Sequence, residues 1–338
     1  MTEELPADNF GYCQTETIQR MLRYGFKFSE DLLDMALIFE NQKLFKWLHT
    51  NTTFQCTLES PMDRAAEYGY IEFVKWLSEN TTTGCTTDAM DKSAELGHFH
   101  ILEWLHLNRS EGCTTNAMDN ACHEYRTAIK DGVLFRKQLE MVKWLHYNRT
   151  EGCTTAAFDQ AAKIGNLAIV DWLHKNRTEG FSSGILDKIA LNGHMELVEW
   201  FEKNTNEEFD LDILDQSITV GNLNLVKYLH ARNRDDNRYL FTTATMNHAI
   251  FKERLDIMEW LHSNVPEICK NTTIDKPLYY NYQTIKWLEE HRNQYYFQRS
   301  IDVVKCIEYY FSNSQYDALE WTLNNLSISD QQLIGIQT

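Results

Sequence analysis

Tryptophan recurs through this sequence at a nearly constant interval. The nine tryptophans, with Tyr228 filling one gap, follow one another at similar spacings, most of them close to one common value. The positions are Trp47, Trp76, Trp104, Trp144, Trp172, Trp200, Tyr228, Trp260, Trp287 and Trp321. A unit of about 28 residues is therefore repeated roughly ten times, which is the signature of a repeat architecture. Because repeated units contact only their neighbours, the 338 residues are expected to form one elongated domain.

The copies that begin at Gly84 and Gly152 each contain two helix patterns separated by a glycine. Thr86 and Thr87 are expected to cap a first helix with their hydroxyls, and Gly97 is expected to end it. The second helix carries an apolar stripe made of Phe99, Ile101, Leu102, Trp104 and Leu105. The pattern predicts an all-α fold, an α-solenoid of stacked antiparallel helix pairs that are each too small to fold alone.

Two further positions keep the same register. Apolar side chains stand at one fixed offset before the aromatic anchor, at Phe28, Cys85, Cys153, Phe181, Phe209 and Phe241. Others stand at a second, shorter offset before it, at Leu33, Met62, Met90, Phe158, Leu186, Leu214 and Met246. An aspartate follows the second position, at Asp34, Asp63, Asp91, Asp119, Asp159, Asp187 and Asp215. The apolar positions predict a core, and the aspartate predicts a local hydrogen-bonding role.

This unit resembles the ankyrin repeat, which reads roughly T-P-L-H-x-A-A-x-x-G-H-L-E-I-V-K-x-L-L. Met90 and Asp91 align with its Leu-His, Ser93 and Ala94 with its paired alanines, and Gly97-His98 with its Gly-His. The segment from Met141 to Leu145 matches I-V-K-x-L. The resemblance extends from about residue 28 to 290, and more faintly to 325. It implies ankyrin-like helix pairs that bind other proteins.

The sequence departs from the ankyrin pattern in three respects. Only Ser60-Pro61-Met62-Asp63 keeps the T/S-P start, Asp or Asn replaces the His, and about 28 residues replace the usual 33 or so. The absent residues fall where ankyrin repeats form a β-hairpin finger, so full fingers are not expected. The chain looks most like a short-period, Trp-rich ankyrin variant. We expect an N-terminal capping helix region at 1–27, the repeat array at 28–290 with an insertion at 123–137, and a degenerate repeat with a C-terminal cap at 291–338.

Composition disfavours two classes of partner. The formal net charge is -17, which opposes general attraction to nucleic acid or to anionic lipid. No segment approaches the roughly 18 uninterrupted apolar residues of a membrane span, and the N-terminus lacks the apolar run of a signal peptide. We therefore expect an intracellular, cytoplasmic, soluble protein whose N-x-S/T sequons are idle.

Catalytic and metal motifs are absent from the sequence. It has no CxxC, Walker loop, GxSxG or HExxH, so no enzyme and no cofactor are expected. Histidines follow Trp-Leu or Tyr-Leu at His49, His106, His146, His174, His230 and His262. Stacked helices lie about 8–10 Å apart, too far for one histidine per repeat to share zinc, so these side chains are expected to bond terminal carbonyls or face solvent. The same distance argues against disulfides among Cys85, Cys113 and Cys153.

Irregular segments leave alternatives open. The insertion HEYRTAIKDGVLFRK is either a basic partner-contact loop or a tolerated surface loop, and the tolerated loop is favoured. The aromatic clusters Tyr279-Tyr280, Tyr295–Phe297 and Tyr309–Phe311 either receive an effector or a second domain from another chain, or belong to a terminal cap, and the cap is favoured. The tryptophan ladder is either a stacking platform for bases or sugars, or half-buried packing between second helices, and packing is favoured.

The function implied by the resemblance is a non-catalytic scaffold or adaptor that binds a protein or peptide. The alternatives are the substrate-recognition subunit of a ubiquitin-ligase or signalling complex, for which no second docking element is visible, and, remotely, an enzyme. In ankyrin arrays the partner lies against the first helices and the tips between repeats. The matching positions here, with the basic residues of the insertion, are Asp88, Lys92, Glu95, Asn116, Asn120, Gln160, Lys163, Arg126, Lys130, Arg136 and Lys137.

Overall fold

The computed structural model describes residues 14–29, 31–54, 56–123, 132–236, 241–269, 282–291 and 303–325. Within these ranges the regular secondary structure is helical and includes no β-strand, which confirms the predicted all-α class. The chain divides into two compact units, Met1–Ile185 and Leu186–Thr338. No helix in the described ranges has the length and apolar character to cross a membrane.

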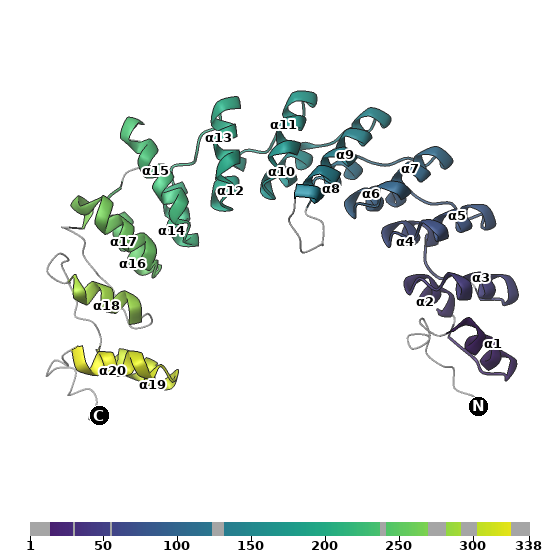
Figure 1. Ribbon diagram of the computed structural model, residues 1–338, viewed down its shortest axis with the longest axis horizontal. Helices are drawn as coiled ribbons and strands as arrows, with labels where there is room; N and C mark the ends of the chain where they lie inside the picture. Colours follow the sequence, from purple (N-terminus) through teal and green to yellow (C-terminus); the bar gives the residue numbers. More distant parts are fainter. Residues whose placement is uncertain are drawn as a thin grey trace. The chain divides into compact units, whose positions relative to one another are not determined.

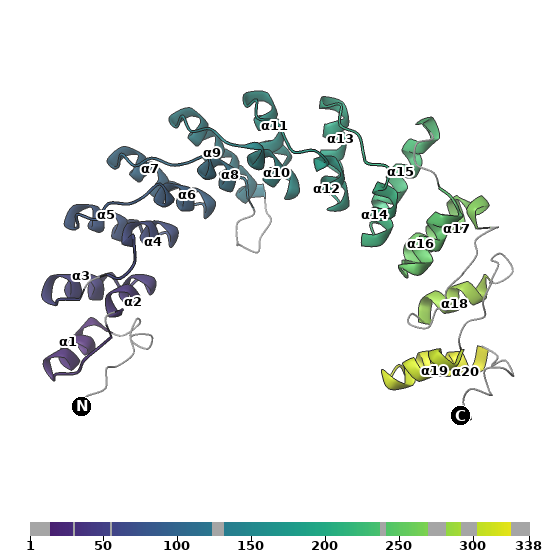
Figure 2. The same cartoon turned by 180° about the vertical axis from the view of Figure 1, so that it is seen from behind.

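The first unit contains a single helix followed by helix pairs (Figure 1). The helices are α1 (Thr15–Arg23), α2 (Leu32–Ile38), α3 (Gln42–Asn51), α4 (Pro61–Glu67), α5 (Ile71–Asn80), α6 (Asp88–Glu95), α7 (Phe99–Asn108), α8 (Asn116–Ala121), α9 (Gly132–Asn148), α10 (Thr155–Lys163) and α11 (Leu167–Asn176). Each even-numbered helix from α2 to α10 packs on the helix that follows it. The same even-numbered helices, which we call the first helices, also pack on one another in chain order. Figure 2 shows this row from behind.

The second unit continues the alternation of first and second helices. Its helices are α12 (Ile185–Leu191, which starts on the last residue of the first unit), α13 (Met195–Asn204), α14 (Ile213–Val220), α15 (Leu223–Asp236), α16 (Thr243–Phe251), α17 (Leu255–Asn264), the 3-10 turn η2 (Pro266–Ile268), α18 (Tyr282–Glu290), α19 (Val303–Ser312) and α20 (Tyr316–Asn325). Here α14 packs on α15 and α16, and α19 packs on α20. Ile285, Cys306, Tyr310 and Ala318 form a buried cluster that joins α18, α19 and α20.

A glycine turn joins the two helices of a pair. After α6 the chain turns at Gly97, whose φ of 77° lies in the left-handed region that glycine adopts without strain. The amide of His98 then donates to the carbonyl of Ser93 at 2.8 Å, which satisfies one of the carbonyls left free at the helix end. The expected helix-ending role of Gly97 is confirmed.

The core follows the predicted register. The residues at the second, shorter offset before each aromatic anchor are all buried, at Leu33, Met62, Met90, Phe158, Leu186, Leu214 and Met246. Small residues such as Ala89 and Ala94, both 0% exposed, let the first helices approach closely. On the second helix α7, which packs against the first helix α6, the side chains of Ile101, Leu102 and Leu105 are buried. Full burial of one such aliphatic side chain contributes about 1.5–3 kcal/mol to the free energy of folding. Because the buried positions recur from pair to pair, the stacked pairs share an apolar core.

Several tryptophans also contact the preceding repeat through a histidine. His106 meets Trp144 with ring centroids 5.1 Å apart and planes at 84°, and His146 meets Trp172 at 5.1 Å and 86°. The same edge-on arrangement joins His49 to Trp76, His230 to Trp260 and His262 to Trp287. Half-buried packing of tryptophan between adjacent second helices is thereby confirmed. The sequence did not anticipate these ring contacts. The His49 side chain remains exposed, as expected, whereas those of His106, His146, His230 and His262 are half-buried against the ring of the next tryptophan.

A hydrogen-bonded clasp joins successive first helices. The carboxylate of Asp91 on α6 accepts from the Thr114 amide at 2.9 Å and from the Thr114 hydroxyl at 2.6 Å. We call this arrangement the Asp–Thr clasp. It recurs as Asp34–Thr57, Asp63–Thr86 and Asp119–Thr154, and Asp159 accepts from the Ser182 amide. The predicted bonding role of the aspartate is confirmed, but the bond is not local, because its partner begins the next repeat.

The Thr-Thr pair divides its tasks. The hydroxyl of Thr114 also accepts from the amide of Asn116 at 3.1 Å, so the first threonine both turns the chain and closes the clasp. The second threonine stands at the N-cap position of the helix in the copies at Thr87 and Thr115 but makes no side-chain capping bond there. The expectation that Thr87 caps its helix through its hydroxyl is therefore wrong, because the first threonine already binds the exposed amide.

Ion pairs in the linkers hold the middle repeats together. The guanidinium of Arg149 pairs with Glu151, two residues later, and lies over Gly112 of the preceding linker. A methyl group added at Gly112 would stand 2.6 Å from the Arg149 Nη2 atom, so only glycine leaves room for this side chain. We call this arrangement, an Arg–Glu ion pair whose guanidinium lies over the glycine of the preceding linker, the linker latch. It recurs as Arg109–Glu111 over Gly84 and as Arg177–Glu179 over Gly152.

Candidate protein-interaction surface

The repeat brings corresponding side chains of the first helices, together with His123 just after the end of α8, into two columns. At the position of Lys92 the neighbouring repeats carry Arg64, Asn120 and Gln160, and at the position of Glu95 they carry Glu67, His123 and Lys163. Because α4, α6, α8 and α10 pack on one another in order, the two columns run side by side. We call the residues of these two columns the first-helix strip. It joins Lys92, Glu95, Asn120, Gln160 and Lys163, which the sequence predicts, to Arg64, Glu67 and His123.

Ion pairs organise the first half of the strip. The Lys92 ammonium lies 2.7 Å from a Glu95 carboxylate oxygen, and the Asn120 amide nitrogen on α8 donates to the same oxygen at 3.4 Å. Arg64 and Glu67 form the same pair one repeat earlier, also at 2.7 Å. The hydrogen bond from Lys92 to Glu95 raises the pKa of Lys92 above its ordinary value, so this ammonium stays charged at neutral pH. The structure therefore brings Lys92, Glu95 and Asn120 together.

The charged groups of the strip remain accessible. The Lys92 and Glu95 side chains are 42% and 32% exposed, and those of Arg64 and Glu67 are 52% and 27% exposed. Pairs of this kind contribute only about 0.2–1 kcal/mol, because water competes for both charges. A partner can therefore replace these internal pairs with its own at small cost, which suits a surface for reversible binding.

The other predicted first-helix residues lie near the strip but have different surroundings. Asp88 and Asn116 stand in the first turns of α6 and α8 with exposed side chains, and their backbone amides donate to the Thr86 and Thr114 hydroxyls. On α10, Lys163 is exposed and Gln160 is half-buried. Arg64 and Glu67 were missed, although they lie exactly one repeat before Lys92 and Glu95 and the repeat spacing was sufficient to find them.

The basic insertion is only partly described. Arg136 and Lys137 are exposed and lie on α9, so this end of the segment extends a second helix and is not the loop that the sequence suggested. The Gln138 side chain, which follows them, is buried and donates to the His123 carbonyl at 2.6 Å. That bond anchors the helix to the end of α8. Arg126 and Lys130 lie outside the described residues.

A histidine of the second unit has surroundings that resemble a catalytic arrangement. His248 on α16 has Nδ1 3.2 Å from the Asp215 carboxylate and Nε2 3.1 Å from the Thr219 hydroxyl. The Thr219 hydroxyl donates its proton to the Asp215 main-chain carbonyl at 2.9 Å, and the Asp215 side chain is 65% exposed. In a catalytic triad the hydroxyl gives its proton to the histidine, and the carboxylate that orients the histidine is buried. Neither condition is met here, so we interpret the three side chains as a contact between α14 and α16.

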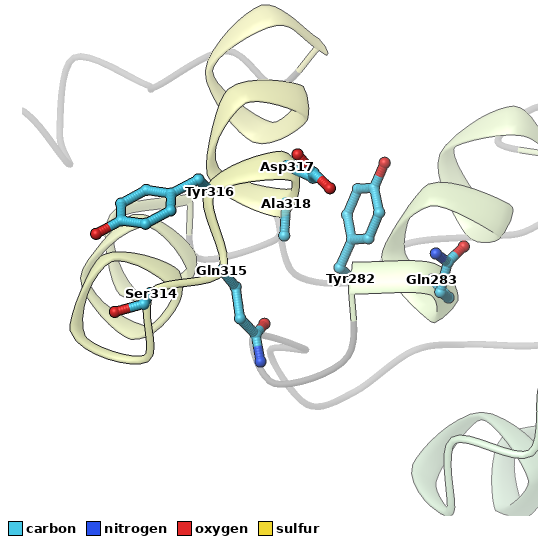
Figure 3. Close-up of a pocket in the computed structure, with 7 residues that line it drawn as sticks. All are labelled: Tyr282, Gln283, Ser314, Gln315, Tyr316, Asp317 and Ala318. Carbon is cyan, nitrogen blue, oxygen red and sulfur yellow. The ribbon is translucent and has the colours of Figure 1, made fainter.

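Two surface pockets offer little chemistry. One, of about 590 Å³, is lined by Tyr282, Gln283 and the segment from Ser314 to Ala318. Figure 3 shows the Tyr316 ring directed away from Tyr282, so the two rings do not enclose a common space. The other, of about 250 Å³, lies among α10, α11 and the linker from Arg177 to Phe181, where Arg177 is already paired with Glu179. The lining of the second pocket also includes Cys153 and His174, but burial raises the pKa of the Cys153 thiol to about 11, which disfavours the reactive thiolate at neutral pH.

Comparison with known proteins gives no assignment. No protein-family model matches the sequence, and no curated protein matches it.

Proposed function

We propose that this chain is a non-catalytic scaffold or adaptor, an α-solenoid of ankyrin-like helix pairs that binds a protein or peptide along the first-helix strip. The observation that carries the proposal is the strip itself. Four consecutive first helices present accessible charged and amide side chains in register, on a support that is fixed by buried alanines and by Asp–Thr clasps. An extended partner is recognised by polar side chains that are held at a fixed spacing and whose internal ion pairs are weak enough to be exchanged for contacts with the partner.

The charge pattern suggests the kind of partner. In the first two repeats of the strip, Arg64 and Lys92 form a positive column beside the negative column of Glu67 and Glu95, and Lys163 ends the second column with a positive charge. A partner of mixed charge matches the first two repeats, and an acidic group of that partner matches Lys163. Glu67 and Glu95 would repel the phosphates of a nucleic acid laid along the strip, so a protein partner is favoured.

Two lysines allow a matched test of this proposal. Lys92 on α6 and Lys75 on α5 are both 42% exposed, and both pair with a glutamate three residues away. They differ in the helix row that carries them. We expect proteins that co-purify with the wild-type chain from its native cells to be retained by Lys75→Glu and lost by Lys92→Glu. Equal retention by both variants would remove the strip from consideration.

A further inference from the structure

One junction of the second unit has an aspartate in place of the threonine whose hydroxyl closes the Asp–Thr clasps of the first unit. At Asp187 on α12, the residue in the register of the clasp threonines is Asp210. Asp187 is only 6% exposed, yet its two carboxylate oxygens share one donor, the Asp210 amide, at 3.3 and 3.4 Å. The corresponding amide distances at Asp63, Asp91 and Asp119 are 2.9, 2.9 and 2.8 Å, each with a threonine hydroxyl in addition.

The replacement places like charges together. Carboxylate oxygens of Asp187, Asp210 and Asp212 all lie within 4.8 Å of one another. The charges of Asp210 and Asp212 both act on Asp187, and the Asp212 carboxylate accepts from the neutral Gln216 amide at 2.8 Å. Burial raises the pKa of Asp187 to about 6, the Asp210 amide opposes the rise, and the neighbouring carboxylates add to it. Two carboxylates this close share a proton more readily than they both ionise.

We propose that Asp187 and Asp210 form a proton-dependent clasp between α12 and the segment that leads into α14. In mildly acidic solution one proton taken from water bridges the two carboxylates. The O–H···O bond that forms replaces the bond that a threonine hydroxyl donates in the Asp–Thr clasps. When the proton is lost to water, both acids are charged, and the segment at Asp210–Asp212 is held only by the long amide bond. This junction is therefore tighter in mild acid than at neutral pH, whereas the Asp119–Thr154 clasp, which has both an amide and a hydroxyl donor, is not.

The sign of the effect follows from linkage. The pKa of Asp187 is higher in the folded chain than in the unfolded one, so its contribution to stability is complete below the unfolded value, near 4, and is lost as the pH rises through about 6. Between pH values of about 5 and 7.5 the closed junction should lose about tenfold in its equilibrium constant.

Hydrogen–deuterium exchange of the full chain, measured at these two pH values and corrected for intrinsic exchange rates, tests the proposal. We expect the amides at 209–214 to be about tenfold more protected in acid. The amides at 153–158, beside the Asp119–Thr154 clasp, are the internal control and should be unchanged. In Asp210→Asn the side-chain amide donates to Asp187 at either pH, so the pH difference at 209–214 should disappear.

Three outcomes would overturn the proposal. The first is an equal pH response at 209–214 and 153–158 in the wild-type chain. The second is a pH difference that survives Asp210→Asn but vanishes in Asp212→Asn, because the relevant proton would then reside on Asp212. The third is full protection at neutral pH on addition of magnesium or calcium chloride alone, which would show that a cation closes the junction in place of a proton.

Discussion

Replacing Thr114 by valine should measure what one Asp–Thr clasp contributes. Valine keeps the shape of threonine and the main-chain amide that donates to Asp91. It removes the hydroxyl that donates at 2.6 Å to the same carboxylate and that also accepts from the Asn116 amide at 3.1 Å, so the measured loss includes both bonds of this hydroxyl. Asp91 is 3% exposed, so water cannot replace the missing donor. A hydrogen bond to a charged group contributes about 1.5–3 kcal/mol, and we expect Thr114→Val to lower the free energy of unfolding by about 2–3 kcal/mol.

Urea unfolding followed by tryptophan fluorescence provides the assay. With a slope of about 2 kcal/mol per molar urea, the loss corresponds to a midpoint lowered by about 1 M. The control is Thr115→Val, because Thr115 is the neighbouring residue of the same type and makes no side-chain capping bond. That variant should stay within about 0.5 kcal/mol of the wild type. If the two variants lose stability equally, the clasp does not stabilise the junction and the reasoning fails.

Two further substitutions address the linker latch. Gly112→Ala and Gly180→Ala both place an alanine at a positive φ, which costs about 1–2 kcal/mol, but only at Gly112 does the new methyl group meet a side chain, that of Arg149. Gly112→Ala should therefore lower the melting temperature more than Gly180→Ala, and equal losses would contradict the latch. The Arg109 hydrogen bond lowers the pKa of Glu111 to about 2, so its stabilisation is present above pH 4.5 and is lost as the pH falls toward about 2. The melting temperatures of wild type and Glu111→Gln should converge over that range, and parallel curves would count against the pair.

The periodicity of the sequence predicted the helix pairs and their apolar contacts. The regular repeat spacing combined with the period of the α-helix determines which residues of each unit face inward, and Met90, Leu102 and Leu105 are buried as expected. The aspartate after each core position was also recognised as a hydrogen-bonding residue. These inferences succeed because the direction of a side chain on a helix depends mainly on its own position in the chain.

Contacts between repeats were predicted less well, because periodicity does not show which polar atoms meet. The hydroxyl that binds Asp91 belongs to Thr114 in the next repeat, and Arg109 reaches back to Gly84 in the preceding linker. Charge patterns give no such pairing until the stacking of helices is known. The insertion was misjudged at Arg136 because the helical pattern of α9 begins before the register of the repeat does. Asp210 stood in the register of the threonines, but its consequence depends on the burial of Asp187.

The central claim, that a protein partner lies along the first-helix strip, is tested most directly by the exchange footprint of the complex. Once a co-purifying protein is identified by the Lys75 and Lys92 comparison, hydrogen–deuterium exchange of the chain should be measured with and without it. Protection concentrated on α6, α8 and α10, with α5, α7 and α11 unchanged, is the predicted result. Protection confined to the second helices would contradict the account.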